Sequence, residues 1–246
     1  MKFLGVIPAR YASTRFPGKP LVDIAGKSMI QRVYEQAIKC ECLSKVLVAT
    51  DDEQIFSHVE SFGGEVMMTS SKHKSGTDRC AEVAKKSSKE YEIIVNIQGD
   101  EPFVEPLQIE ALCRTFADYD VIISTLIKKI TDAEDLTNPN IPKVVIDNSS
   151  FAIYFSRAPI PHNRRSENKV EWLKEHIYYK HIGMYAYRRD ALMKIARLPE
   201  SDLEKTEALE QLRWLENGFR IKTAVTDIET IAIDTPDDLL KTYNKI

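Results

Sequence analysis

Short apolar runs alternate with helical patterns from the first residue of the chain, and this alternation leaves few folds open. Four runs have the length and apolar content of buried strands: Phe3–Ile7, Val46–Ala49, Val66–Met68 and Ile93–Ile97. The segments between them show the period of amphipathic helices. Strands separated by helices predict a parallel sheet with crossover connections, so the expected fold class is α/β.

Capping residues mark where several of these helices begin and end. Ser28, with Gln31 three positions later, predicts a helix start. Asp52 opens a second helix that is expected to end at Gly63-Gly64, where a positive φ is easily adopted. A third helix is predicted to begin near Thr77 or Asp78, and a fourth to follow Pro106.

The regular alternation ends near residue 120. Three strand-like runs then follow one another, at Val121–Ile127, Lys143–Ile146 and Phe151–Phe155. The charged stretch Asn163–Glu175 is predicted to be a mobile loop or lid. Later elements are expected at Ile182–Tyr187 (strand), Arg189–Arg197 (helix), Glu204–Glu216 (helix closed by Gly218), Lys222–Val225 and Thr230–Ile233 (strands) and from Thr235-Pro236 (helix). We expect a single domain over residues 1–246, with an inserted lobe at about residues 120–190.

Composition argues against several classes of protein. A hydrophobic content of 43% and a charged content of 29% are typical of a soluble globular protein. The formal charge of -3 gives no overall attraction to nucleic acid or to an anionic membrane. No apolar run approaches the roughly 20 residues that a membrane span needs, and the opening residues lack a signal-peptide core. We expect a cytoplasmic protein that neither inserts into membranes nor binds nucleic acid.

The four cysteines are scattered along the chain and show no metal-binding pattern. They stand at Cys40, Cys42, Cys80 and Cys113. The spacing Cys40-x-Cys42 is not that of a C-x-x-C half-site for zinc. Free thiols in a reducing compartment are the interpretation that we adopt.

Positive charge is concentrated in the loop at residues 8–20, directly after the first predicted strand. The loop contains Arg10, Arg15 and Lys19 and no carboxylate before Asp23. Ligands bind at the carboxyl ends of strands in such sheets, and Arg and Lys together suit a triphosphate. The loop is neither a Walker A motif nor a G-x-G-x-x-G motif. On composition alone, a solvated basic loop remains an alternative.

The order of residues in this loop is more informative than its composition. Val6-Ile7-Pro8-Ala9-Arg10-Tyr11-Ala12-Ser13-Thr14-Arg15-Phe16-Pro17-Gly18-Lys19-Pro20-Leu21 closely resembles the signature loop of the CMP-Kdo synthetases, within the sugar nucleotidyltransferase superfamily (Kdo, 3-deoxy-D-manno-octulosonate). Further blocks resemble the family's in the same order: Ala49-Thr50-Asp51-Asp52, Ser75-Gly76-Thr77-Asp78-Arg79, Asn96-Ile97-Gln98-Gly99-Asp100-Glu101-Pro102, Tyr154-Phe155-Ser156-Arg157, His181-Ile182-Gly183-Met184-Tyr185, Leu209-Glu210-Gln211-Leu212-Arg213 and Asp234-Thr235-Pro236. The resemblance implies a Rossmann-like, mostly parallel central sheet flanked by helices, with a smaller lobe for sugar binding and dimerisation.

The resemblance also implies which residues contact CTP. They are Arg10, Ser13, Arg15, Lys19, Ser75, Thr77, Arg79 and Gln98, of which Arg15 and Lys19 would stabilise the leaving pyrophosphate. Ser75-Gly76-Thr77 could instead be a turn with a helix cap.

Two aspartates follow apolar strands and are candidates for a metal site. Asp100 comes after Asn96-Ile97-Gln98-Gly99, and Asp234 comes after Ile231-Ala232-Ile233. Mg²⁺ prefers oxygen ligands, commonly one or two carboxylates together with substrate phosphates. Each aspartate could instead end its strand or cap the next helix. The resemblance favours both as Mg²⁺ ligands and catalytic residues, although Ala232 stands where many relatives have Gly.

An acidic sugar needs a fixed cation and several hydrogen-bonding side chains. Strand alternation places His181, Gly183 and Tyr185 on one face, opposite apolar residues, and leaves open space above Gly183. Without the resemblance, a structural histidine and a solvated helix would be the ordinary interpretation. With it, the residues expected to bind the sugar are Gln98, Arg157, His181, Tyr185, Glu210 and Gln211.

The reaction implied is transfer of CMP from CTP to Kdo with release of pyrophosphate, which activates Kdo for lipopolysaccharide synthesis. An alternative acceptor is 8-amino-Kdo or another acidic sugar such as a sialic acid. A nucleotide-binding regulator without catalysis is an alternative of a different class, and the joint presence of Arg15, Lys19, Asp100 and Asp234 argues against it. The resemblance also implies a homodimer.

Overall fold

The fold is described from a computed structural model, which covers residues 1–12, 16–229, 232–233 and 235–242. Two compact units are present within the chain. Unit 1 comprises Met1–Cys113, Ala186–Ala196 and Thr230–Ile246, and unit 2 comprises Arg114–Tyr185 and Arg197–Glu229. The sugar-binding and dimerisation roles of the lobe at about residues 120–190 stay predictions.

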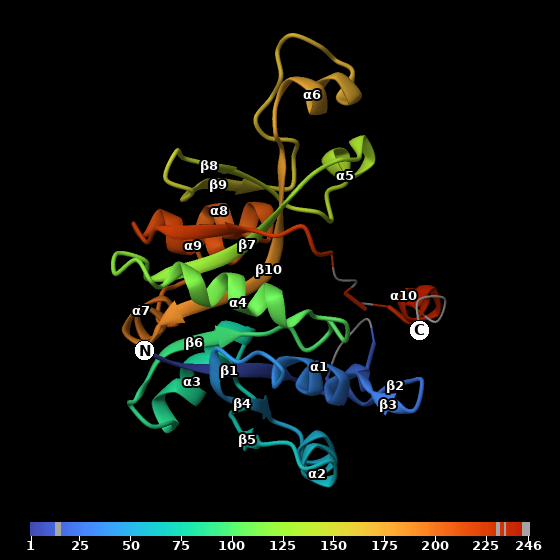
Figure 1. The fold of residues 1–246 in the computed structure, drawn as a ribbon, viewed down its shortest axis with the longest axis vertical. Coiled ribbons are helices and arrows are strands. Elements are labelled where there is room, and N and C mark those ends of the chain that lie inside the picture. Colours follow the sequence, from blue (N-terminus) through green and yellow to red (C-terminus); the bar gives the residue numbers. More distant parts are fainter. Residues whose placement is uncertain (13–15, 230–231, 234, 243–246) are drawn as a thin grey trace. The chain divides into compact units, whose positions relative to one another are not determined.

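Unit 1 is built on parallel strands in the order β6-β1-β4-β5 (Figure 1). Their bounds are β1 Lys2–Ala9, β4 Leu43–Thr50, β5 Val66–Met68 and β6 Tyr91–Asn96, and a small hairpin is formed by β2 Asp23–Ile24 and β3 Lys27–Ser28. From β1 the chain adds β4 and β5 on one side and then returns to place β6 on the other. The strand order therefore reverses between β1 and β6, which is where ligands bind in sheets of this type.

The helices of unit 1 begin at the capping residues that the sequence predicts. Ser28 accepts a hydrogen bond from the Gln31 N–H at the start of α1, and Asp52 caps α2. The third helix begins at Gly76, slightly before the predicted start, because Ser75 is its cap. The bounds are η1 Lys19–Leu21, α1 Met29–Ala37, α2 Glu53–Ser61, α3 Gly76–Lys86, α4 Pro106–Thr115 (whose last two residues fall in unit 2), α7 Arg189–Ile195 and α10 Pro236–Thr242.

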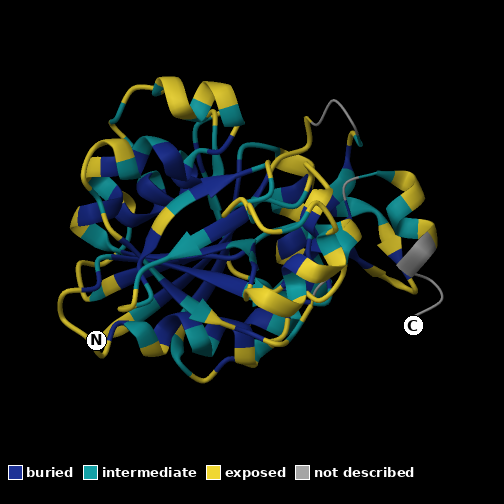
Figure 2. Cartoon of the chain, turned by 90° about the horizontal axis from the view of Figure 1, so that it is seen from above, coloured by how far each residue is buried: buried dark blue, intermediate teal, exposed yellow. Residues whose placement is uncertain are grey.

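Burial explains why the sequences of these strands are almost entirely apolar. Val6, Val48 and Val95 are fully buried, since helices cover both faces of a parallel sheet. Figure 2 shows much of the central sheet in dark blue, with yellow on the outward faces of the helices. A smaller cluster joins α10 to the first loop region, where Leu239 and Phe16 pack against a buried core; its buried members are Ile24, Met29 and Ile233.

Unit 2 contains both parallel and antiparallel strand pairs. β11 (Ile221–Val225) pairs in parallel with β7 (Ile123–Lys129), while β8 (Lys143–Ile146) pairs antiparallel with β9 (Ala152–Ser156) and β10 (Tyr179–Arg188). The last three residues of β10 belong to unit 1. The helices of unit 2 are α5 Ala133–Thr137, α6 Lys169–Glu175, α8 Asp202–Glu207 and α9 Gln211–Glu216.

Three predictions about elements are wrong in part. The single helix over Glu204–Glu216 is two short helices, because Ala208 adopts a left-handed conformation with φ 50°. The stretch Asn163–Glu175 is not wholly a loop, since α6 occupies its second half with Trp172 buried against Tyr178. Of the strand expected at Thr230–Ile233, only residues 232 and 233 are described, and neither is in a strand.

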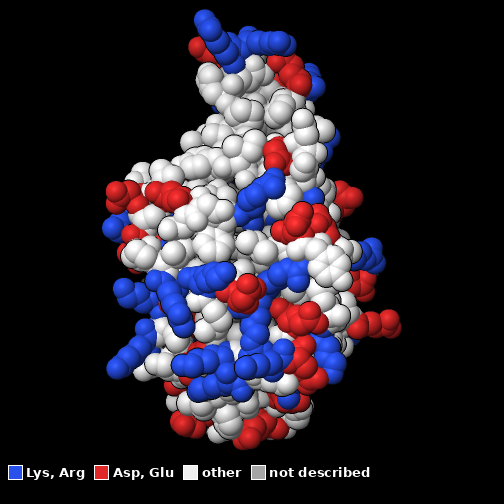
Figure 3. All heavy atoms as spheres, turned by 90° about the vertical axis from the view of Figure 1, so that its left-hand side faces the viewer, with Lys and Arg blue, Asp and Glu red and all other residues white. Residues whose placement is uncertain are grey.

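The predicted fold class is confirmed: the chain is α/β, with a mostly parallel sheet flanked by helices. In the part of the chain that the structure describes, no helix is both long enough and apolar enough for a membrane crossing. Basic and acidic side chains are intermixed on the face drawn in Figure 3. Some oppositely charged side chains are paired, as Lys2 and Glu90 are at 2.5 Å.

Candidate functional site

A pocket lies in unit 1 at the carboxyl ends of β1 and β6, where the strand order reverses. Its volume is about 260 Å³. The residues that line it, which define the β1–β6 pocket, are Pro8, Ala9, Arg10, Lys19, Pro20, His73, Lys74, Ser75, Gly76, Arg79, Gln98, Gly99 and Asp100. Four of these lining residues are Lys or Arg, and one, Asp100, is a carboxylate. The pocket therefore suits an anion with a bound cation. A larger cavity of about 650 Å³ in unit 2, between β8 and the segment after α6, contains none of the predicted site residues.

Lys19 and Asp100 are 81 residues apart in sequence and form an ion pair in this pocket. The Lys19 Nζ donates to Asp100 Oδ2 at 2.8 Å, and both side chains are partly exposed. Lys19 follows Gly18, whose φ of 70° places it in the left-handed region that favours glycine. The Gly18 N–H donates to the Tyr11 carbonyl at 3.0 Å, which fixes the backbone directly before Lys19.

Gly99 allows the two strand ends to approach each other. A Cβ atom at Gly99 would lie 2.7 Å from the Pro8 carbonyl oxygen, which is too close for any other residue. The backbone of the Gln98–Asp100 turn therefore passes directly over the end of β1. This contact places Asp100 beside the first loop.

The segment that precedes Asp234 is also bonded to Asp100. The Ile233 N–H donates to the Asp100 carbonyl at 2.9 Å, and the Ile233 side chain is buried in the core of unit 1. Asp234 itself lies outside the described residues, as do Ser13 and Arg15. Their predicted roles as metal ligand and nucleotide contacts stay predictions.

Ser75 and its neighbours form the helix cap that the sequence left open as an alternative. The Ser75 side chain accepts from the Asp78 N–H at 3.2 Å, and Asp78 accepts in turn from the Ser75 N–H at 3.3 Å. Thr77 is buried at 2% exposure and does not line the pocket. Ser75 and Gly76 do line it, so the N-terminus of α3, where backbone N–H groups favour an anion, faces the pocket.

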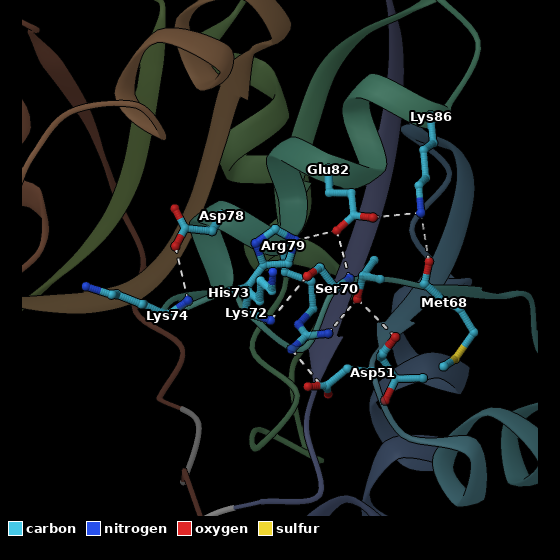
Figure 4. Close-up of polar contacts among 12 residues, drawn as sticks. Asp51, Met68, Ser70, Lys72, His73, Lys74, Asp78, Arg79, Glu82 and Lys86 are labelled. Atoms are coloured by element: carbon cyan, nitrogen blue, oxygen red, sulfur yellow. Dashed lines mark hydrogen bonds and ion pairs between the residues drawn. The ribbon is translucent and has the colours of Figure 1, made fainter.

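Arg79 is held almost completely inside unit 1. Its guanidinium lies 3.2 Å from an Asp51 carboxylate oxygen and donates to the Thr69 hydroxyl, and Arg79 is 4% exposed (Figure 4). Buried charges are tolerated when they are paired and hydrogen-bonded. Arg79 therefore braces the pocket wall through Asp51, and its predicted contact with a nucleotide stays a prediction.

His73 and Lys74 line the pocket, although sequence reasoning did not select them. His73 Nε2 hydrogen-bonds to Glu82, which also pairs with Lys86 at 2.6 Å (Figure 4). Burial opposes ionisation of Glu82, but the bonds from Lys86, the Ser70 N–H and His73 outweigh it and lower its pKa to about 2. The Lys74 side chain extends away from the other labelled residues. In the sequence, the signal that could have identified them is their position directly before Ser75-Gly76-Thr77-Asp78-Arg79.

In unit 2, His181 lies on β10 in a cluster of aromatic side chains. Its ring contacts Phe155 and Tyr185 at centroid distances of 5.0 and 5.3 Å, and Tyr185 contacts Trp214 at 5.1 Å. The Thr125 hydroxyl donates to the Met184 carbonyl at 2.9 Å, so its oxygen accepts from His181 Nε2–H at 3.0 Å. We call these five aromatic and hydroxyl residues the His181 cluster: Thr125, Phe155, His181, Tyr185 and Trp214.

Burial controls the ionisation of this cluster. It lowers the pKa of His181 to about 3, so the ring is neutral at physiological pH and Nδ1 is a hydrogen-bond acceptor. Burial, together with the charge of Glu210, raises the pKa of Tyr185 well above its usual value. His181 is therefore suited to orient a hydroxyl group rather than to act as a base, because its affinity for a proton is low.

The pH dependence of stability follows from the lowered pKa of His181. Unfolded His181 takes up a proton below pH 6.5 and folded His181 only below about 3, so acid favours unfolding within this window. As the pH falls from 6 to 4, the unfolding free energy of the wild-type protein should drop more steeply than that of the His181→Gln variant, by about 1.4 kcal/mol per pH unit. Urea unfolding of both proteins at each pH measures this difference. Parallel pH profiles would contradict the assignment.

Gly183 borders open space, and Gln211, a predicted sugar-binding residue, has an unpaired side-chain amide nitrogen among the described residues. A Cβ atom built on Gly183 meets no heavy atom within 4 Å, as strand alternation predicts. Gln211 is 5% exposed, and its amide nitrogen has no hydrogen-bond partner in the described part of the chain. Buried polar groups are normally paired, so a missing partner indicates a ligand or a water molecule.

Arg157 and Glu210 each have protein partners. The Arg157 guanidinium donates to the carbonyls of Glu207, Pro139 and Ala208 at 2.6, 2.9 and 3.1 Å. Glu210 pairs with Arg213 at 2.9 Å. Helix α8 ends at Glu207 and α9 begins at Gln211, so Glu207 and Gln211 lie on different helices and not on the single helix that the sequence predicts. Instead, Glu207 accepts hydrogen bonds from Ser156 and from the Arg157 N–H.

Comparison with known proteins gives the family. A model described as cytidylyltransferase matches residues 4–228. A 3-deoxy-manno-octulosonate cytidylyltransferase of Parabacteroides distasonis is 56% identical over 245 residues, covering 98% of this chain and 96% of the relative. The chain belongs to the 3-deoxy-manno-octulosonate cytidylyltransferase family. A member from Bacteroides thetaiotaomicron is 55% identical, with 97% and 96% of the two chains covered.

Solved structures agree with this membership. A CMP:2-keto-3-deoxy-manno-octonic acid synthetase complexed with CTP superposes with a TM-score of 0.92 at 43% identity, over 100% of this chain and 98% of that one. A 4-diphosphocytidyl-2C-methyl-D-erythritol synthase from Anaerococcus prevotii has a TM-score of 0.63 at 12% identity and covers 99% and 98% of the two chains, so it shares the fold alone. The family predicted from the N-terminal loop is therefore confirmed.

Proposed function

We propose that this protein transfers CMP from CTP to Kdo, giving CMP-Kdo and pyrophosphate. The observation that carries the proposal is the β1–β6 pocket, in which Lys19 and Asp100 form an ion pair 2.8 Å long. Relatives at 56% and 55% identity over nearly the whole chain are named for this reaction. The product, CMP-Kdo, is the activated form of the sugar for lipopolysaccharide synthesis.

Residues of unit 1 bind and orient the nucleotide. Arg10 and Lys19 supply positive charge at the carboxyl end of β1, and the N-terminus of α3 at Ser75 adds backbone N–H donors. Lys19 exchanges its bond to Asp100 for a phosphate oxygen when the triphosphate enters. Fixed cations of this kind offset charge that develops on the leaving pyrophosphate, and Arg15 is expected to contribute in the same way.

We infer that Asp100 and Asp234 hold Mg²⁺. The fit rests on a partly exposed Asp100 carboxylate in a pocket for phosphates, and on the hydrogen bond between Ile233 and the Asp100 carbonyl. The described residues contain no cluster of three or more metal-binding side chains, so substrate oxygens would complete the coordination sphere. When bound, the ion would neutralise charge on the phosphates and orient the acceptor hydroxyl.

Residues of unit 2 bind the sugar. Neutral His181 accepts a hydrogen bond from a hydroxyl group at Nδ1, and the buried Gln211 amide gains the partner that it lacks. The open space above Gly183 leaves room for the sugar ring. Arg157 retains N–H donors beyond the three that bind carbonyls, and these suit the sugar carboxylate. The anomeric hydroxyl then attacks the α-phosphate and pyrophosphate leaves, without a covalent enzyme intermediate.

The test is pyrophosphate release from CTP with a panel of acceptors. Kdo, 8-amino-Kdo and a sialic acid are assayed separately, each with Mg²⁺ and again with excess chelator. We expect the highest kcat/KM with Kdo and loss of turnover in chelator. A preference for 8-amino-Kdo would replace the proposed acceptor. CTP binding without pyrophosphate release from any of the three would instead indicate a nucleotide-binding regulator.

The Lys74 side chain provides a test of the nucleotide half alone. Lys74 lines the pocket, is exposed, and has its backbone fixed by a hydrogen bond to Asp78. An exposed charge near a phosphate contributes roughly 0.2–1 kcal/mol, so Lys74→Ala should raise the KM for CTP about 1.4- to five-fold and leave the KM for Kdo unchanged. Initial-rate kinetics measure both constants. Lys72→Ala, at an exposed lysine outside the pocket lining, is the matched control.

We also infer that the protein is a cytoplasmic homodimer, as the family resemblance implies. Free cysteines at all four positions are compatible with a reducing compartment. Light scattering of the purified protein tests the oligomeric state, and a single mass near 28.1 kDa would contradict the dimer.

A further inference from the structure

Three of the four cysteines, separated in sequence, lie together in unit 1 away from the β1–β6 pocket. The Cys42 Sγ lies 3.0 Å from Cys40 Sγ and 2.8 Å from Cys113 Sγ. Cys40 and Cys42 are in the turn between α1 and β4, and Cys113 is in α4, 71 residues after Cys42. Cys40 and Cys113 are buried, while Cys42 is partly exposed and accessible to a small molecule. We call these three residues the thiol cluster.

The hydrogen bonds in this cluster distinguish its sulfur atoms. The Cys42 thiol donates to Cys113 Sγ, and this bond, with burial and the nearby Glu110 charge, raises the pKa of Cys42 to about 12. The bond to Cys42, together with burial, also raises the pKa of Cys40. Cys113 Sγ accepts the Cys42 S–H bond, so these two sulfur atoms face each other. Cys42, the partly exposed member, and Cys113 are therefore the two sulfur atoms best placed to join.

We propose that Cys42 and Cys113 are an oxidisable pair that a peroxide converts into a disulfide bond. The thiolate of one of the two cysteines attacks one oxygen of hydrogen peroxide, the O–O bond breaks, and hydroxide leaves and takes up a proton to become water. The sulfur of the other cysteine then displaces water from this sulfenic acid, and its thiol proton is released with that water. Two thiols are oxidised to one disulfide, and one peroxide is reduced to two molecules of water.

The backbone favours this pair over Cys40 and Cys42. The turn that carries Cys40 is held by hydrogen bonds from the Cys40 N–H to the Ala37 carbonyl and from the Leu43 N–H to the Cys40 carbonyl, both 3.1 Å long. A bridge between residues two positions apart would have to distort this turn. Cys42 and Cys113 come from separate elements, so small movements of both side chains can bring their sulfurs to bonding distance.

The position of the cluster predicts the effect of the bond. Leu43, directly after Cys42, pairs with Phe3 at the amino end of β1, whereas the β1–β6 pocket follows the carboxyl end of β1. An eight-residue strand spans about 25 Å, so oxidation should leave catalysis unchanged. A bridge that closes a long loop restricts the unfolded chain, so the oxidised protein should melt at a higher temperature than the reduced protein.

The experiment uses the full chain, treated with hydrogen peroxide and then alkylated without reduction. We expect the intact mass to fall by about 2 Da before alkylation, and non-reduced peptide mapping to join the Cys42 and Cys113 peptides; dithiothreitol should reverse both changes. Cys113→Ser and Cys42→Ser should abolish the cross-link, while the matched Cys40→Ser variant should retain it. Circular dichroism checks that each variant is folded.

The wild-type map decides the proposal even if a variant does not fold. A bridge between Cys40 and Cys42, sulfinic acid without any bridge, or an unchanged set of free thiols at peroxide concentrations that oxidise an unstructured cysteine peptide would each overturn it. Pyrophosphate release by the oxidised protein is measured alongside. Because the cross-link is scored by mass, failure of this proposal is distinguishable from failure of the proposed activity.

Discussion

Replacing Asp100 with asparagine should reduce turnover by roughly 100- to 1,000-fold at saturating CTP and Kdo. Asparagine keeps the shape of the side chain but removes the charge that faces Lys19 at 2.8 Å and that we propose binds Mg²⁺. Pyrophosphate release under saturating substrates measures the loss. The concentration of Mg²⁺ needed for half-maximal activity should rise in the same variant.

Stability separates this catalytic effect from unfolding. The Lys19 and Asp100 side chains are 15% and 28% exposed, so loss of their ion pair should change the unfolding free energy by no more than about 1 kcal/mol. Glu90→Gln is the matched control, because it breaks the exposed pair with Lys2 outside the pocket and should leave turnover unchanged. Near-wild-type turnover of Asp100→Asn would remove Asp100 from the metal site.

Gly99→Ala should impair both stability and turnover, because the two strand ends cannot approach as closely. The added Cβ would lie 2.7 Å from the Pro8 carbonyl oxygen, so the turn before Asp100 must move away from β1. Overpacking of this kind costs about 1–3 kcal/mol. Displacement of Asp100 by about 1 Å should lower kcat roughly 100-fold. Urea unfolding and pyrophosphate release measure the two effects.

Gly183→Ala is the matched control for this substitution. Its Cβ meets no heavy atom within 4 Å, and the residue lies in a regular strand, so we expect the unfolding free energy to change by no more than about 0.5 kcal/mol. If the space above Gly183 receives the sugar, this variant should raise the KM for Kdo and leave the KM for CTP unchanged. Equal destabilisation by both substitutions would show that the contact between a Cβ at Gly99 and the Pro8 carbonyl oxygen does not cause the loss of stability.

Local patterns predicted much of unit 1 because their physical causes are local. A side-chain oxygen at Ser28 or Asp52 satisfies N–H groups within three residues, so each helix start is visible in the sequence. The run Val66–Met68 was predicted with the bounds that β5 has. By contrast, Ala208 adopts a left-handed conformation without a glycine to signal it, so the two helices around it were predicted as one.

The candidate site was predicted less evenly. Resemblance to a family selected Lys19, Asp100 and His181, but it gave no distances between them. His73 and Lys74 were missed because a His and a Lys before a helix cap are ordinary surface residues until a pocket is seen beside them. Arg79 was selected as a ligand contact, and only its pairing with Asp51 shows that it also supports the pocket wall.

The order of apolar runs, the capping residues and the N-terminal loop determined the fold class and the family from the sequence alone. These features depend on interactions within a few residues or on residue order itself. The tertiary structure decided which distant residues meet: Lys19 with Asp100, Gly99 with Pro8, and Cys42 with Cys113. Such contacts depend on how strands pair and how helices pack over separations of 70 residues or more, and no local pattern records the resulting distances.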